Sequence, residues 1–141
     1  MSDPRILALT PALVDYAVGH GSTHDDEVAH ELRARTQALG PVAGMQIGPD
    51  QGQLLTLLPR LVGARRALEV GTFTGYSALC IARGLAPGGT LTCCDINEEW
   101  TAIGRRAWAR AGLDGRIDLR LAPALDTLAT LPTEPQIDLA F

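Results

Sequence analysis

A short stretch of the sequence, ALEVGTFTGYSA from Ala67 to Ala78, concentrates residue types that bind nucleotides. A strand-like apolar pattern runs into two glycines, Gly71 and Gly75, and then into the start of a helix. Glycines at such a turn let backbone amides approach a ligand, and the amides at a helix N-terminus favour an anionic group. The stretch therefore predicts a loop that holds a nucleotide-like cofactor.

The spacing of the glycines argues against a dinucleotide. A dinucleotide-binding loop has the pattern G-x-G-x-x-G, which lets the backbone approach a pyrophosphate. Counted from Gly71, the other two glycine positions hold Phe73 and Tyr76. Because bulky residues hinder the approach of the amides, a nucleoside ligand without phosphates fits the loop better. An oxidoreductase of the NAD type stays open as an alternative.

Three polar residues near this loop could bind such a ligand. Asp95 ends the next predicted strand, where an acid commonly accepts hydrogen bonds from the ribose hydroxyls; alternatively, it is a turn acid. Glu69 lies inside the first strand, and a buried carboxylate is costly unless a cationic ligand group or loop amides pair with it; alternatively, the strand is an edge strand and Glu69 faces water. Ser77 lies where helix amides favour a carboxylate, or it caps the helix. An adenosine bearing an amino acid and a positive sulfur, S-adenosylmethionine, meets all three demands.

The elements that must position these residues alternate between strand and helix. The pattern predicts strands over 67–70, 90–95, 116–121 and 136–141, and helices over 76–85, 97–111 and 126–131. This alternation is typical of a Rossmann-like α/β fold, in which a parallel sheet carries helices on both faces. Such a sheet binds its ligand outside the carboxyl ends of the strands, where Gly71 and Asp95 lie.

Helical patterns precede the alternating part. Residues 5–19 and 25–39 read as helices, and a further helix is predicted over 51–62. We expect an N-terminal helical region over 1–48 and a cofactor-binding domain over 49–141. The fourth strand ends at Phe141, before the loop that should contribute to the site. The sequence therefore predicts the front part of a longer protein, truncated after the fourth strand.

Composition argues against several classes of function. The net charge is −4, without a basic patch that would indicate a nucleic-acid partner. No apolar run approaches the ~18 residues of a membrane span, and the N-terminus does not read as a signal peptide, so we expect a cytoplasmic protein without a membrane partner. All 12 basic residues are arginine, which excludes lysine chemistry. The three cysteines are expected to be reduced and mostly buried: Cys80, Cys93 and Cys94.

The sequence resembles the cation-dependent O-methyltransferase family, which includes catechol and caffeoyl-CoA O-methyltransferases. The resemblance rests on MQIGPDQGQLL, LEVGTFTGYSAL, DIN and IDLRLAPAL, in this order, and spans about residues 30 to 141. It implies a class I methyltransferase fold and the transfer of a methyl group to a hydroxyl of a small phenolic or catechol-like acceptor. A homodimer is also expected.

The resemblance assigns roles to particular residues. The methionine end of the cofactor would contact Glu69, Gly71, Thr72 and Ser77, with Gly75 in the same loop. The ribose would contact Asp95. Three more residues would complete the pocket: Ile96 against the adenine, and Ile47 and Ala124 at backbone or wall positions. On sequence alone, the last three could be plain core residues. The resemblance also implies a divalent cation, such as Mg²⁺, and a catalytic base. The ligands of the cation and the base would lie beyond Phe141, so no metal-ligating or catalytic residue is expected in this sequence. A non-catalytic binding or scaffold module of the same fold is the second alternative.

Overall fold

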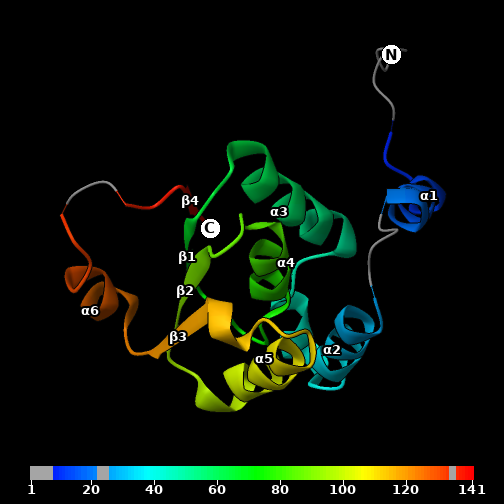
Figure 1. Cartoon of the computed structure of the whole chain (residues 1–141). Coiled ribbons are helices and arrows are strands. Elements are labelled where there is room, and N and C mark those ends of the chain that lie inside the picture. Colours follow the sequence, from blue (N-terminus) through cyan, green and yellow to red (C-terminus); the bar gives the residue numbers. More distant parts are fainter. Residues whose placement is uncertain (1–7, 22–25, 134–135) are drawn as a thin grey trace.

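The chain forms a four-stranded parallel sheet, shown in Figure 1. The computed structural model describes residues 8–21, 26–133 and 136–141. The sheet has the order β3-β2-β1-β4 and consists of β1 (Arg66–Val70), β2 (Thr90–Asp95), β3 (Ile117–Leu121) and β4 (Leu139–Ala140). Because β1 lies between β2 and β4, the alternative that placed Glu69 on an edge strand is wrong.

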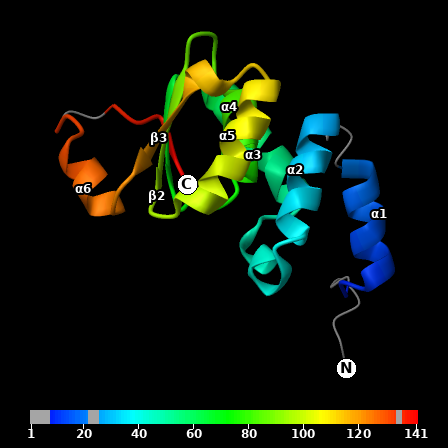
Figure 2. The ribbon, with the colours of Figure 1, turned by 90° about the horizontal axis from the view of Figure 1, so that it is seen from below.

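Helices cover both faces of the sheet, which confirms the predicted Rossmann-like architecture. Figure 2 shows α6 (Ala124–Ala129) on one side of the strands and α3 (Pro49–Val62), α4 (Tyr76–Gly84) and α5 (Glu98–Arg110) on the other. Two more helices, α1 (Pro11–Gly21) and α2 (Glu27–Gln37), lie outside this layer, and 3-10 turns occupy Gly40–Met45 and Asp114–Arg116. None of the helices in the described ranges is long and apolar enough to cross a bilayer.

Three predicted elements differ from the observed ones: the first helix, the last helix and the fourth strand. The first helix begins at Pro11 and not at residue 5, and residues 8–10 are not helical, while 5–7 lie outside the described residues. Its start is set by the Thr10 hydroxyl, which accepts from the Leu13 amide at 3.3 Å, and by proline at the first helical position. The helix predicted over 126–131 spans Ala124–Ala129 instead and follows Pro123, which occupies the cap position without a side-chain hydrogen bond.

The fourth strand is also shorter than predicted, with two residues in place of six. Before Leu139, the Asp138 amide still donates to the Arg66 carbonyl at 2.8 Å, while the Asp138 carboxylate accepts from the amides of Arg65 and Arg66 at 2.8 and 2.9 Å. The ladder continues to Phe141, whose amide donates to the Leu68 carbonyl at 2.9 Å. A side chain thus replaces part of the expected backbone pairing.

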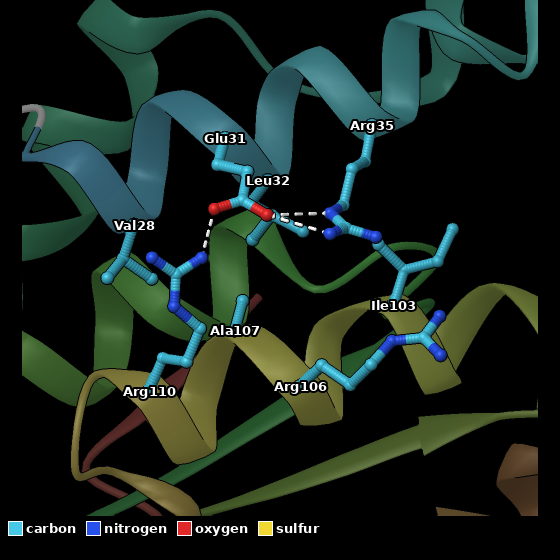
Figure 3. A pocket seen from close by; sticks show the side chains of 8 residues that line it. All are labelled: Val28, Glu31, Leu32, Arg35, Ile103, Arg106, Ala107 and Arg110. Carbon is cyan, nitrogen blue, oxygen red and sulfur yellow. Dashed lines mark hydrogen bonds and ion pairs between the residues drawn. The ribbon is translucent and has the colours of Figure 1, made fainter.

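An ion pair joins α2 to α5 beside an apolar contact. Figure 3 shows Glu31 between Arg35 of its own helix and Arg110 of α5. Exposed pairs of this kind contribute only about 0–1 kcal/mol. Leu32 of α2, which is 1% exposed, packs in the same place and carries more of the contact. Helix α2 is therefore fixed to α5, and through it to the rest of the fold.

The contact between α3 and α4 requires a glycine. A Cβ at Gly84 would lie 2.3 Å from the backbone carbonyl oxygen of Thr56. We expect Gly84→Ala to push the helices apart and to lower the free energy of unfolding by about 1–3 kcal/mol, as overpacking does. Denaturant melts measure the change. Gly19→Ala, in helix α1 with nothing within 4 Å, is the control and should not destabilise; equal losses in both variants would contradict the packing argument.

Candidate cofactor site

The glycine loop lies at the carboxyl end of β1, and the carboxylate of Asp95 fixes it. One oxygen, Oδ2, accepts from the amides of Thr72 and Phe73 at 2.9 and 2.7 Å. The other, Oδ1, accepts from the amides of Ile96 and Asn97 at 2.7 and 2.8 Å. One carboxylate therefore ties the loop after β1 to the loop after β2, and its roughly four acceptor positions are filled.

The loop contains a residue in a conformation that side chains rarely adopt. Phe73 has a φ of +51°, which costs a residue with a Cβ about 1–2 kcal/mol. Its amide is the one held at 2.7 Å by Asp95, and its ring meets Trp100 edge-on with centroids 5.1 Å apart. These two contacts hold the strained residue in place, so the loop has its shape before any ligand binds.

The far end of the loop packs against α5. The indole Nε1 of Trp108 donates to the Gly75 carbonyl at 2.9 Å, and Trp108 is 2% exposed. Gly75 has a φ of +81°, and a Cβ there would lie 2.5 Å from the Trp108 ring. Only glycine fits this position, for both its backbone angle and its space.

Glu69 is fully buried beside the loop. Its Oε2 accepts from the Cys93 thiol at 3.4 Å. Its Oε1 and the nearby Oγ1 of Thr72 have no hydrogen-bond partner within the part of the chain that the structure describes. Burial raises the pKa of Glu69 to about 7, although the Ser77 hydroxyl and the Cys93 thiol oppose the shift. A buried carboxyl with an unused oxygen is costly, and a cationic ligand group would complete it.

The other predicted contact residues lie around this end of the sheet. Ser77 is in the first turn of α4 and 8% exposed, Ala124 begins α6, and Ile47 packs partly against the core. Ile96 follows β2 and is 78% exposed, so the plain-core alternative is wrong for it. An apolar side chain exposed beside the loop can lie against a flat ring. The cysteines Cys80, Cys93 and Cys94 are free and buried, as predicted.

A sequence model described as O-methyltransferase matches residues 19–141. The chain belongs to the O-methyltransferase family. Among its relatives, the catechol O-methyltransferase domain-containing protein 1 of Mus musculus is 48% identical over 82 residues, which cover 58% of this chain and 31% of that protein. The caffeoyl-CoA O-methyltransferase 1 of Zea mays is 39% identical over 110 residues, covering 78% of this chain and 42% of that protein.

Solved O-methyltransferases share the fold of this O-methyltransferase chain. The O-methyltransferase from Bacillus cereus, solved in complex with SAH (S-adenosylhomocysteine), superimposes with a TM-score of 0.80 at 33% identity. The match covers 92% of this chain and 59% of that one. The chain thus spans about a third to three fifths of the length of these relatives.

The divalent cation that the resemblance implies has no candidate site among the residues that the structure describes. Within 8–21, 26–133 and 136–141, no group of three His, Cys, Asp or Glu side chains could hold a metal ion. The expectation that the ligands and the base lie beyond Phe141 stays a prediction.

Four residues that hold the loop were not predicted from the sequence: Thr36, Gln46, Thr74 and Trp108. Trp108 lies on α5, far along the chain from Gly75, and the three others come from separate elements. No local spacing indicates such contacts, because each depends on how helices pack on the sheet.

Proposed function

We propose that this chain forms the cofactor-binding part of an S-adenosylmethionine-dependent O-methyltransferase. The observation that carries the proposal is Glu69, a fully buried carboxyl with an unused oxygen at the cofactor loop. S-adenosylmethionine brings an ammonium and a sulfonium, which a carboxylate stabilises. NAD fits less well, because Phe73 and Tyr76 stand where a dinucleotide loop needs glycines to approach the pyrophosphate. The SAH bound to the Bacillus cereus neighbour supports the same choice.

In this proposal, each residue of the site binds a different part of the cofactor. Glu69 and Thr72 face the cationic groups, while Ser77 and the first amides of α4 receive the carboxylate. Asp95 faces the ribose, and a ribose hydroxyl must share an acceptor position with one of the four amides that already bond to the carboxylate. Ile96 covers the adenine, and Ile47 and Ala124 form the walls. The cofactor supplies the activated methyl group, and these residues bind and orient it.

The proposals for the methyl acceptor and for the oligomeric state rest on the family resemblance alone. We propose a small phenolic or catechol-like hydroxyl as the methyl acceptor, in keeping with the names of the catechol and caffeoyl-CoA relatives. A divalent cation and a homodimer belong to the same proposal. Sedimentation of the protein at its full natural length tests the dimer, and methyl transfer to a catechol with and without magnesium tests the acceptor and the cation.

Calorimetry tests the cofactor. We expect S-adenosylhomocysteine to bind at least about a hundredfold more tightly than NAD, a difference of about 3 kcal/mol. Tighter binding of NAD would overturn the proposal. Binding of S-adenosylhomocysteine without methyl transfer to any catechol-type acceptor would favour the scaffold alternative.

A further inference from the structure

We propose that Thr36 and Gln46 are positioning residues for cofactor binding, which act by holding Thr74 in the glycine loop. The inference rests on the proposed function, since it concerns the same cofactor loop. It adds two residues that lie outside the sheet and its connecting helices. Thr36 is on α2, and Gln46 follows the 3-10 turn before α3.

The three side chains meet in one buried cluster. The hydroxyl oxygens of Thr36 and Thr74 are 2.8 Å apart. The amide nitrogen Nε2 of Gln46 donates to the Thr36 hydroxyl at 2.8 Å and to the Thr74 hydroxyl at 3.3 Å. Both threonines are 0% exposed, whereas Gln46 is half-buried. Three segments that are distant in sequence therefore converge on the cofactor loop.

Counting donors and acceptors fixes the direction of each bond. Thr36 donates its only hydroxyl hydrogen to the Leu32 carbonyl at 2.9 Å. Its oxygen must then accept from both Thr74 and Gln46, which fills its two lone pairs. With neither hydroxyl hydrogen left over, Gln46 must present its NH₂ group and not its carbonyl. Both hydroxyl hydrogens and the NH₂ group of Gln46 then have acceptors, and in a buried place the loss of one member leaves the others unpaired.

Thr74 lies at the turn of the glycine loop, where a shift of its backbone would move the neighbouring loop residues. It lies between Phe73 and Gly75, which both have a positive φ, as does Gly71 at the start of the loop. Its carbonyl oxygen rests on α5, where a Cβ at Gly104 would come within 2.9 Å of it. Its side chain is held separately, by Thr36 and Gln46. Release of that side chain would let the whole turn move, including the amides that Asp95 holds.

The same cluster joins two walls of the proposed pocket. Gln46 immediately precedes Ile47, a wall residue of the proposed site. The bonds from Gln46 to Thr74 therefore set the distance between the segment at Ile47 and the glycine loop. A ligand that fills the space between them needs that distance to be fixed beforehand, because ordering a loop on binding costs affinity.

The test removes one hydroxyl at a time from the protein at its full natural length. Thr36→Val and Thr74→Val keep the shape of the side chain and delete its hydrogen bonds. We expect each to weaken binding of S-adenosylhomocysteine about tenfold, and the double variant to weaken it no more than either single one, because the residues act through one cluster. Thr74→Ser should restore binding. In turnover assays, KM for S-adenosylmethionine should rise while kcat stays unchanged.

Thr56→Val is the matched control. The Thr56 hydroxyl also joins two elements, since it donates to the Cys80 carbonyl of α4 at 3.1 Å, but it does not touch the loop. It should lower thermal stability and leave affinity unchanged. If Thr74→Val behaves in the same way, the inference is wrong. If the valine variants fail to fold, Gln46→Ala at its half-exposed site decides, and unchanged affinity there also refutes the inference.

A second measurement separates this inference from the proposed function. Hydrogen exchange at the amides of Thr72, Phe73 and Gly75 reports the position of the loop without any cofactor. We expect faster exchange in Thr36→Val and Thr74→Val and no change in Thr56→Val. If the unmodified protein does not bind S-adenosylhomocysteine, the proposed function fails, and these exchange rates still show whether the cluster positions the loop.

Discussion

Replacing Asp95 by alanine should weaken binding of S-adenosylhomocysteine by about 10- to 150-fold, the equivalent of one or two charge-assisted hydrogen bonds. The carboxylate accepts from four backbone amides, at Thr72, Phe73, Ile96 and Asn97. Alanine leaves all four without their acceptor and releases the strained Phe73. Calorimetry measures the affinity, and a melt shows how much of the fold is lost. A change below about threefold in an intact fold would show that Asp95 is only a turn residue.

Asp95→Asn separates an acceptor effect from a loss of shape. Asparagine keeps one oxygen, and its NH₂ group must then face two backbone amides, which are donors as well. One of the two loops loses its anchor whichever way the side chain is turned. We therefore expect asparagine to behave more like alanine than like aspartate, although it is nearly isosteric.

A ligand without ribose hydroxyls tests the ribose role of Asp95 itself. The 2′,3′-dideoxy form of S-adenosylhomocysteine cannot donate to a carboxylate from its sugar. If Asp95 holds the ribose, the alanine substitution should cost less affinity with the dideoxy ligand than with the normal one. If Asp95 only shapes the loops, both ligands should lose the same factor. Because backbone amides already occupy the acceptor positions of the carboxylate, this comparison of two proteins with two ligands decides whether Asp95 also bonds to the ribose.

The sequence predicted the sheet well because its strands and helices follow local rules. β2 begins and ends where the apolar run predicts, and Asn97 caps α5 through a bond from the Trp100 amide at 2.9 Å. Asp95 was placed correctly at the end of β2, but its four amide partners could not be predicted. Two of them belong to a loop that comes next to it only when β1 and β2 pair.

The parts that could not be predicted depend on contacts between distant segments. Thr36 and Thr74 are 38 positions apart, and nothing near either residue indicates the other. β4 was predicted too long, since before Leu139 the contact with β1 combines one backbone bond from the Asp138 amide with two bonds to the Asp138 carboxylate. For Glu69 the chemistry was predictable, since a carboxyl in a central strand needs a partner. Which neighbours it meets followed only from the register that sets it beside Cys93.

Glu69 should make the protein less stable as the pH rises, which is the opposite of the effect that most carboxyl groups have. The pKa of Glu69 is raised from an ordinary 4.5 to about 7 in the folded state. Between these values the unfolded chain has lost the proton and the folded protein keeps it. The contribution of Glu69 to stability is therefore fully present below pH 4.5, falls as the pH rises, and levels off above about 7. The total change is about 3 kcal/mol.

Glu69→Gln isolates this contribution, because glutamine does not titrate. Other acids act in the opposite sense, since amide partners hold the pKa of Asp138 below its usual value. The difference between the unfolding free energies of the two proteins cancels such terms. Relative to the glutamine variant, the unmodified protein should lose stability from pH 5 to pH 7 in denaturant melts. Exposed Glu99→Gln is the control, and its curve should follow the unmodified protein. Parallel curves for Glu69→Gln would contradict the prediction.

The cofactor should respond to the same proton in the opposite direction. A bound ammonium or sulfonium stabilises the ionised form of Glu69, so S-adenosylmethionine must displace the proton wherever the free protein still holds it. Affinity should rise with pH up to about 7, by at most about tenfold per unit. The Cys93 thiol does not compete, since burial and the neighbouring Glu69 raise its pKa and keep it a neutral donor. Calorimetry in buffers of different ionisation enthalpy counts the protons released, and Glu69→Gln should remove that release. Equal proton release by both proteins would place the titrating group elsewhere.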